Sequence, residues 1–483
     1  MAEGKPKGPT QAQRLIELAQ RRYEIVKDLN GKVYAVPKTT LRIALPLQGQ
    51  GSFSQKLMRD YYERYKTPPN ATTLKSAIGI LEQETTDGER QSVHLRSART
   101  PDGLVIDLGD ATGRAVVITG NGWKIVKSPP TDVIFRRTRL TGALPAPARK
   151  GSLDPLRDLA NVDDAGWDLV RAWLVLAWMP DIPVPILAIT GHQGSGKSVL
   201  GRYLVSLVDP SGAPLKKPPK GRDLGEWHTV ASGSRVIGLD NVSHINEEFS
   251  DALCRAVTGD GNAKRELYSD DELVVQSFKR AVLITSIDPG SMRGDLGERL
   301  MPIELGPIEG RRGEKELDRL YNNLRPQLLG GLLSLISKVL ANPVTLKRPP
   351  RMADAANVMA TVDRVLGSGS VSAYQQGQAE VVGTVLESDP LAAAVLAFAR
   401  RNPDWEGTPT DLYGQLSRTR DLDAPNWPGN TRTMSARLKR MAPALKDAHS
   451  LHVSTKRGTE RLIRLEWAKP RRKVTRKKGG ARG

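Results

Sequence analysis

Apolar residues recur at two different spacings in the first part of this chain, and the change of spacing separates two regions. Up to residue 90 they recur every three to four positions, which predicts helices over residues 11–27, 53–65 and 72–84. Asn70 stands before the third helix and is expected to cap it. From residue 92 to 138 apolar and polar residues alternate, which predicts short strands at SVHLRSA, GLVIDLG, RAVVITG and GWKIVKS.

Beyond a linker rich in Pro and Gly, helical patterns alternate with short, wholly apolar runs. Residues 153–179 are mostly helical in pattern, and apolar strands are expected at 186–190, 234–241 and 280–288. Strands separated by helix-sized crossovers pair in parallel, so this region predicts an α/β fold with a parallel sheet. Two helices, 315–324 and 327–340, are expected to form a lid. An irregular connector with one helix at 352–366 follows.

The last region predicts three helices and then two strands. The helices are expected at 391–400, 410–416 and 431–445, and Asn430 can cap the third. Met434, Leu438, Met441 and Leu445 form the buried stripe of that helix, which leaves Arg432, Lys439 and Arg440 outside. The strands 451–454 and 461–465 flank a basic turn, Lys456-Arg457-Gly458. This order resembles a winged helix whose third helix enters a groove of duplex DNA, and a protein-docking module is the alternative.

These patterns divide the chain into six regions. They are a helical N-terminal region (1–90), a small β-rich domain with its linker (91–150), an α/β domain (151–345), a connector (346–388), a winged-helix domain (389–467) and a basic tail (468–483). The tail from Lys469 onward carries eight Lys or Arg and no acidic residue.

The motif GHQGSGKS, residues 191–198, carries the clearest chemistry. It follows an apolar strand and precedes a helical pattern, which is the context of a phosphate-binding loop of the G-x-x-x-x-G-K-[ST] type. The glycines let main-chain N–H groups turn inward, and the following helix directs its positive end at the same anion. Lys197 is expected to reach the terminal phosphates and Ser198 to ligate Mg²⁺. The nucleotide-binding residues predicted here are Gly191, His192, Gln193, Gly194, Ser195, Gly196, Lys197, Ser198 and Val199.

Polar residues stand at the ends of the next two apolar strands. Asp240 ends VIGLD and is expected to support the Mg²⁺ that Ser198 contacts, so the predicted metal ligands are Ser198 and Asp240. Ser286 follows the apolar run RAVLIT and is expected to orient the attacking water or sense the γ-phosphate. Arg299, with Arg293 as second choice, is expected to act on the nucleotide of a neighbouring subunit.

Together these segments resemble the ATPase domain of superfamily 3 helicases, a branch of the AAA+ ATPases. The resemblance is to the primase-helicases of phages, plasmids and integrative elements. It rests on GHQGSGKS, VIGLDNVS, DALCRAVTGDG, KRELYSDDELVVQSFKRAVLITS and GDLGERLMPIEL. It implies an AAA+ core preceded by an α+β region, and ring-shaped oligomers, usually hexamers. ATP would bind between subunits, and single-stranded DNA would lie in the central channel.

The chain departs from that family at three places. The sensor strand of the family usually ends in an asparagine, whereas here Thr285-Ser286-Ile287 follows the apolar run. Many members carry a second carboxylate after the metal-binding aspartate, whereas this chain has Asn241, which can position a water but cannot take its proton. The hairpin expected to point a basic residue into the channel has an acidic turn, Ser269–Glu272. The predicted DNA-binding residues near its base are Lys264, Arg265, Lys279 and Arg280. No primase site is recognisable, so a separate primase or replication protein is an expected partner.

Charge and composition narrow the class of partner. The formal net charge of +19 favours an anionic partner, most often nucleic acid. A single cysteine excludes intramolecular disulfides and zinc sites built from several cysteines. The first residues lack the apolar core of a secretory signal and no apolar run is long enough for a bilayer, so cytoplasm is the expected compartment.

Three functions remain open from the sequence. The first is an ATP-driven DNA translocase or helicase in the replication of a mobile element. The second is a nucleotide-switched ATPase that loads or remodels replication proteins without unwinding DNA. The third is a DNA-binding regulator whose ATPase is vestigial.

Overall fold

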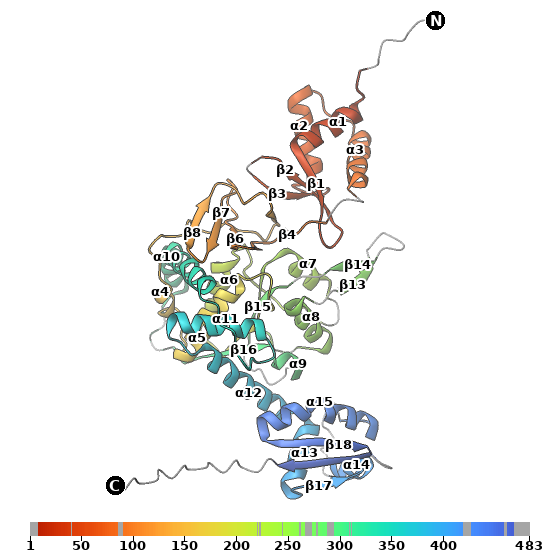
Figure 1. Cartoon of the computed structure of the whole chain (residues 1–483), viewed down its shortest axis with the longest axis vertical. Coiled ribbons are helices and arrows are strands. Elements are labelled where there is room, and N and C mark those ends of the chain that lie inside the picture. Colours follow the sequence, from red (N-terminus) through yellow and green to blue (C-terminus); the bar gives the residue numbers. More distant parts are fainter. Residues whose placement is uncertain are drawn as a thin grey trace, which may run out of the picture. The chain divides into compact units, whose positions relative to one another are not determined.

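The structure is a computed structural model of the whole chain (Figure 1). It describes residues 8–39, 41–85, 90–219, 221, 224–243, 245–259, 262–265, 273–276, 279–286, 294–308, 310, 312–418, 427–457 and 461–467. The chain divides into two compact units. One comprises residues 1–288 and 299–375, and the other comprises residues 289–298 and 376–483.

The first unit begins with three helices packed on a sheet rather than with helices alone. The helices are α1 (Gln11–Arg22), α2 (Phe53–Tyr65) and α3 (Ala71–Glu84), and the strands between them are β1 (Tyr23–Lys27), β2 (Val33–Pro37) and β3 (Ile43–Pro46). The predicted helix over residues 11–27 was too long, because its last five residues pair antiparallel with β2. Asn70 caps α3 as predicted, accepting the N–H groups of Thr72 and Thr73.

The β-rich region forms two sheets. The strands predicted from alternation appear as β4 (Val93–His94), β5 (Ser97–Thr100), β6 (Gly103–Asp107), β7 (Ala115–Thr119) and β8 (Gly122–Val126), and β9 (Ile134–Arg136) follows. Strands β5 to β8 form an antiparallel meander. Strand β9 instead pairs in parallel with β3 and β4, which joins the first 46 residues to this region in one five-stranded sheet.

A parallel five-stranded sheet follows in the order β11-β12-β15-β10-β16 and confirms the predicted α/β architecture. Its strands are β10 (Ile186–Gly191), β11 (Leu215–Lys216), β12 (Val236–Leu239), β15 (Ala281–Thr285) and β16 (Leu300–Leu305). The helices of this region are α4 (Asp154–Arg157), α5 (Asp164–Ala177), α6 (Lys197–Val208), α7 (Gly225–Gly233) and α8 (Glu247–Thr258). Helix α6 packs on β10, β12 and β15. An antiparallel hairpin, β13 (Asn262–Arg265) with β14 (Leu273–Gln276), lies between α8 and β15 in the chain.

The two predicted lid helices are one continuous helix, α10 (Glu314–Ala341), with Pro326 inside it. Proline removes one N–H from a helix, and a prolyl residue therefore often marks a boundary. Here the helix continues, and the Pro326 carbonyl accepts the N–H of Ala148, 2.8 Å away.

The predicted irregular connector holds two helices, α11 (Ala353–Leu366) and α12 (Ser370–Ser388). The first was predicted and the second was not. Asp363 accepts the N–H groups of Ser370 and Val371 at 2.7 and 3.0 Å, so the short Gly/Ser run starts a helix instead of a loop. None of the helices in the described part of the chain combines the length and apolar character that a bilayer crossing requires.

The second unit contains the three helices and two strands expected at the C-terminus, together with one further strand, the short helix α9 and α12 from residue 376 onward. Its elements are α9 (Gly294–Gly297), α13 (Pro390–Arg401), β17 (Trp405–Gly407), α14 (Pro409–Arg418), α15 (Thr431–His449), β18 (Leu451–Arg457) and β19 (Arg461–Trp467). The unpredicted strand β17 pairs with β19, which gives the antiparallel order β17-β19-β18. Asn430 caps α15, and Met434, Leu438 and Leu445 are buried on it, as predicted. Met441, the fourth residue of the predicted stripe, is half-buried.

A buried ionic network joins the β-rich region to the parallel sheet. Asp209 directly follows α6, and its carboxylate accepts the Nε of Arg96 at 2.9 Å. Its other oxygen accepts the main-chain N–H groups of Arg235 and Val236 at 2.7 and 3.2 Å. The Arg235 side chain is buried, and burial lowers the pKa of its guanidinium to about 10. Its N–H groups donate to the carbonyls of Ala177, Met179 and Lys279.

We expect Asp209→Ala to destabilise this unit by about 3–5 kcal/mol, because it leaves the buried Arg96 guanidinium without its carboxylate. The measurement is the urea midpoint of the unfolding transition, followed by tryptophan fluorescence. Glu63→Ala is the control, since it removes a carboxylate from the exposed pair Arg59–Glu63 and should hardly move the midpoint. Equal midpoints for Asp209→Ala and the control would contradict the prediction.

Candidate nucleotide-binding site

The loop between β10 and α6, residues 191–198, has the backbone conformation that its glycines predict. Gly191, Gly194 and Gly196 have φ values of 137°, 82° and 87°, which side-chain-bearing residues rarely adopt. A Cβ atom at Gly191 would also lie 2.7 Å from the carbonyl oxygen of Leu305. The loop therefore depends on glycine both for its turn and for its approach to β16. We call residues 191–198 the glycine loop.

Lys197 is the first residue of α6 and folds its side chain back over the glycine loop. Its ammonium donates to the carbonyls of Gly191 and His192, both at 2.7 Å. The unpaired N–H groups of the first turn of α6 open onto the same loop, where they favour an anion. Of the other predicted nucleotide-binding residues, Ser195 is buried, Gly196 and Val199 are half-buried, and the exposed ones are His192, Gln193, Gly194 and Ser198.

Ser198 and Asp240 come together at the carboxyl edge of the parallel sheet. Ser198 Oγ donates to Asp240 Oδ1 at 2.7 Å, and Thr285 Oγ1 donates to the same oxygen at 2.6 Å. The Thr285 hydroxyl in turn accepts the N–H of Asn241 at 2.9 Å. A helix, α6, and a strand, β15, thus hold the carboxylate that follows β12.

The structure corrects the choice of Ser286 as the polar residue facing the site. The Ser286 hydroxyl is buried and donates to the carbonyl of Val242 at 2.7 Å. Successive side chains of a strand point to opposite faces, and Thr285 lies on the face covered by α6, with its methyl group 3.2 Å from where a Cβ of Gly201 would be. Leu283 contacts the same point of α6, so Leu283 and Thr285 share the face that α6 covers, which the sequence pattern of β15 alone does not identify.

Asn241 follows the metal-site aspartate with a left-handed backbone, φ 53°. Its side chain is exposed at the end of β12. Asparagine tolerates this conformation better than most residues. The amide can orient a water molecule, and it cannot accept the proton of one.

Two oxygen ligands are available for a metal ion. Among the described residues there is no group of three or more His, Cys, Asp or Glu side chains that fits a metal. Mg²⁺ does not need such a group, because it keeps several waters and binds one or two protein oxygens together with substrate phosphates. Ser198 Oγ and Asp240 Oδ1 fit that requirement.

The wall of the site includes residues that sequence reasoning missed. Asn161 donates its amide to the carbonyls of Gly306 and Pro307, just after β16 ends. This fixes the following residue, Ile308, beside the glycine loop, where its Cδ1 lies 3.4 Å from a Cβ position on Gly196. An exposed isoleucine offers an apolar surface next to a phosphate-binding loop.

Helix α6, which begins at the glycine loop, also packs against α10. Tyr203 stacks on Tyr321 with ring centroids 4.1 Å apart, and its hydroxyl donates to Asp318 at 2.9 Å. Arg202 pairs with Glu314 at 2.8 Å and with Asp318 at 3.1 Å. Burial raises the pKa of the Tyr203 phenol above its usual range, and the bond to Asp318 adds to this.

Arg299 lies at the opposite edge of the sheet from the glycine loop. It directly precedes β16, whose first residue pairs with Ile186, while Gly191 pairs with Leu305 at the other end. Five residues of strand separate these pairs, about 17 Å. An arginine side chain at this place does not reach the glycine loop of its own chain. The second choice, Arg293, lies outside the described residues, as does the acidic turn 269–272.

The predicted DNA-binding residues are spread over three places. Lys264 and Arg265 belong to β13, and their side chains lie outside the description. Lys279 donates to the carbonyl of Asp181 at 2.7 Å. Arg280 donates to the carbonyls of Ala231 and Lys279, and burial lowers its pKa to about 9. This packing favours a structural role for Arg280 over the predicted DNA contact.

The predicted DNA-binding residues of the second unit lie on α15 and the hairpin. Arg432, Lys439 and Arg440 are exposed on α15. Lys456 is exposed on β18 and lies 3.8 Å from Glu406. The side chain of Arg457 is outside the described part.

Two family models match this chain. The model of the actinomycete integrative conjugative element replication protein matches residues 153–382, and the model of the AICE RepA C-terminal domain matches residues 391–478. Solved structures similar to this chain include the SCCmec type IV Cch active helicase (12% identity, TM-score 0.44, 92% of this chain and 93% of that chain covered). Another is the apo A form of the NrS-1 C-terminal region (10% identity, TM-score 0.40, 95% and 100% covered). The search of curated proteins gives no match.

We expect Thr285→Val to lower ATP turnover about 10- to 100-fold, because it removes the hydroxyl that orients Asp240 while keeping the side-chain shape. The apparent affinity for nucleotide should change much less. The control is Ser286→Ala, because the Ser286 hydroxyl donates to the main-chain carbonyl of Val242. The measurement is steady-state phosphate release, and a larger loss in Ser286→Ala than in Thr285→Val would contradict this assignment.

Proposed function

The chain belongs to the family of replication proteins of actinomycete integrative conjugative elements, and we propose that it is an ATP-dependent DNA translocase or helicase in the replication of such an element. The observation that carries this proposal is the joint placement of the glycine loop, Ser198 and Asp240 at one edge of a parallel sheet. The host cytoplasm is the proposed compartment.

Each residue of the site has a proposed role in ATP hydrolysis. The N–H groups of the glycine loop and the Lys197 ammonium bind the β- and γ-phosphates. Ser198 and Asp240 hold Mg²⁺, which when bound neutralises charge on these phosphates. Thr285 keeps Asp240 in its rotamer, and Asn241 orients the attacking water. Ile308 supplies an apolar surface to the base.

We further propose an AAA+ type core that works as a ring, a hexamer, with single-stranded DNA in its channel. The distance of Arg299 from its own glycine loop supports a role at a neighbour's nucleotide, with Arg293 as the second choice. Lys264, Arg265 and Lys279 are the proposed DNA contacts of the channel. A separate primase or replication protein is a proposed partner.

A second function is favoured by one observation. Asn241 stands where a proton-accepting carboxylate would polarise water, so slow hydrolysis suits a nucleotide-switched ATPase that loads or remodels replication proteins on DNA. A regulator with a vestigial ATPase has less support, because the glycine loop, Ser198 and Asp240 are all in place.

We expect Lys197→Ala to abolish ATP hydrolysis and strand displacement while the protein still binds DNA. The alanine removes the charge that contacts the terminal phosphates and leaves the fold of the parallel sheet. The assays are DNA-stimulated phosphate release and displacement of a labelled strand from a forked duplex. Hydrolysis without displacement in the unsubstituted protein would favour the loader, and undiminished turnover in Lys197→Ala would overturn the site.

The proposed role of the second unit is duplex DNA binding by a winged helix. The order α13, β17, α14, α15, β18, β19 with a three-stranded antiparallel sheet supports this. Helix α15 presents Arg432, Lys439 and Arg440 to solvent, and a long basic tail follows the sheet. Protein docking is the alternative role of such a unit.

We expect Arg432→Gln/Lys439→Gln to weaken binding of the full chain to duplex DNA and to make its salt dependence shallower. Each lost phosphate contact should reduce the log–log slope by about 0.9, and each bidentate base contact is worth about 1–3 kcal/mol of sequence preference. Fluorescence anisotropy at several salt concentrations measures both. The control is Lys56→Gln/Lys75→Gln on α2 and α3, and equal curves for the two variants would favour docking instead.

A further inference from the structure

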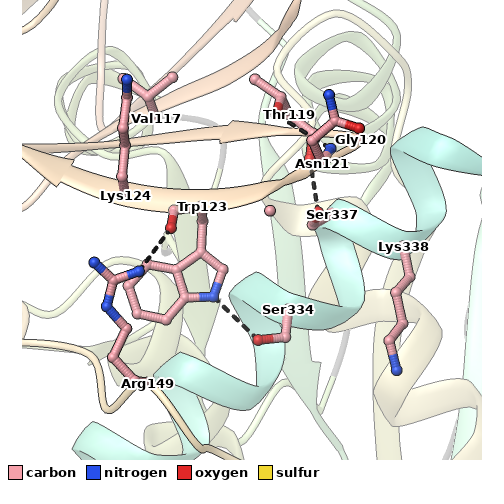
Figure 2. Close-up of a pocket in the computed structure, with 11 residues that line it drawn as sticks. Val117, Thr119, Gly120, Asn121, Trp123, Lys124, Arg149, Ser334, Ser337 and Lys338 are labelled. Atoms are coloured by element: carbon pink, nitrogen blue, oxygen red, sulfur yellow. Dashed lines mark hydrogen bonds between the residues drawn. The ribbon is translucent and has the colours of Figure 1, made fainter.

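A pocket in the first unit lies away from the glycine loop, between the β7–β8 hairpin and the C-terminal half of α10. Its volume is about 690 Å³, within the range of small-ligand sites. Figure 2 shows Trp123 of the hairpin on the side of Ser334 and Ser337 of α10, with Arg149 beside the Trp123 ring. The Lys124 side chain extends to the opposite side of the strand. Along α10, Asp318 beside α6 and Ser334 in the pocket are about 24 Å apart.

Hydrogen bonds between the hairpin and α10 fix the walls of this pocket. Trp123 Nε1 donates to Ser334 Oγ at 3.0 Å, and Ser337 Oγ donates to the carbonyl of Thr119 at 2.7 Å (Figure 2). A Cβ at Gly120 would lie only 3.3 Å from Cα of Ala341, so the hairpin turn sits directly against the helix. The pocket is therefore formed before any ligand binds.

The linker that carries Arg149 is fixed by the same helix. A Cβ on Gly330 would lie 1.9 Å from the carbonyl oxygen of Ala148, and one on Gly331 would lie 2.6 Å from the carbonyl carbon of Ser152. The main chain of the linker thus crosses α10 at a place where only glycine fits. Arg149 then extends over the Trp123 ring, 4.8 Å from its centroid, and donates to the Trp123 carbonyl at 3.0 Å.

The pocket carries positive charge and an aromatic ring together. Lys124, Arg149 and Lys338 come from three different elements, and all three are exposed. None of the lining residues is acidic. Within the part of the chain that the structure describes, neither the Lys124 nor the Lys338 ammonium makes an ion pair. The lining thus combines three exposed cations with no acidic residue, which favours an anionic ligand.

We propose that this pocket binds a segment of single-stranded DNA. The ammonium groups of Lys124 and Lys338 and the guanidinium of Arg149 bind phosphates of the strand as it passes over the hairpin, and an unstacked base packs against Trp123. Single-stranded DNA presents both groups at once, whereas the bases of a duplex are stacked inside it. The inference rests on the proposed DNA-binding function and adds to it a contact outside the ring channel and outside the second unit.

The test compares Lys124→Gln/Lys338→Gln with the unsubstituted full chain. We expect the Kd for fluorescein-labelled dT20 to rise about 10-fold at moderate salt and the log–log salt slope to fall by about 1.4, since each single-strand phosphate contributes about 0.7. Binding to a duplex of the same length should hardly change. Lys56→Gln/Lys75→Gln removes the same charge from exposed positions of α2 and α3 and is the matched control.

A second measurement tests whether a DNA base packs against Trp123. Oligonucleotides with 5-iododeoxyuridine, irradiated in complex with the full chain, should crosslink to the peptide containing Trp123, and Trp123→Leu should remove that crosslink. DNA-free ATP turnover and thermal unfolding of the lysine variants should match the unsubstituted protein, because neither lysine belongs to the nucleotide site.

The outcomes separate this inference from the proposed function. If the unsubstituted chain does not bind dT20, the DNA-binding function fails and the inference fails with it. If that chain binds dT20 and the lysine variant binds it with equal Kd and slope, only the pocket is overturned. Equal weakening toward single-stranded and duplex DNA, or no crosslink in residues 115–126, also overturns the assignment to single-stranded DNA.

Discussion

The carboxylate of Asp209 lies between the C-terminal end of α6 and the N-terminal end of β12. The opposite ends of these two elements form the candidate site. Helix α6 begins at Lys197 and ends just before Asp209, while β12 begins beside Arg235 and leads to Asp240. One oxygen of Asp209 holds the main chain where β12 begins, and the other binds Arg96 from the β-rich region. The buried Asp209 carboxylate, the Arg96 guanidinium and the main-chain N–H groups are favourable only as a complete set, because each buried charge alone has a large desolvation cost. The position of Ser198 relative to Asp240 depends on that set.

Helix α10 connects the remaining parts of the first unit. Its N-terminal half packs on α6 through Tyr321 and Asp318, and its C-terminal half forms the wall of the Trp123 pocket. Its middle accepts the linker through Gly330 and Gly331. A single rigid helix therefore contacts both the element that carries the glycine loop and the pocket proposed for DNA. Binding of nucleotide and binding of DNA would affect each other through α10 if this helix has two discrete positions that both ligands favour differently. The affinity for DNA measured with and without nucleotide would detect such coupling.

Local patterns in the sequence predicted the parts of the structure that local physics determines. The glycine loop, the alternating strands of the β-rich region, the caps Asn70 and Asn430 and the buried stripe of α15 all depend on neighbours within a few residues. The errors arose where distant residues decide. Arg96 and Asp209 are 113 residues apart, so their pairing left no mark in the sequence. The choice between Thr285 and Ser286 depended on which face of β15 α6 covers. Helix α10 continues through Pro326, where the distant linker residue Ala148 donates its N–H to the Pro326 carbonyl.

The bond between Trp123 and Ser334 has a consequence for the order in which this protein is made. The two residues are 211 positions apart, so the β7–β8 hairpin leaves the ribosome long before the helix that covers it. At a translation rate of about 5–20 residues per second, Ser334 is synthesised on the order of 10–40 s after Trp123. During that time the half-built meander presents an uncovered tryptophan and an open face to other nascent chains. Synthesis rate, or a chaperone that shields this hairpin, thus affects the yield of folded protein independently of its final stability.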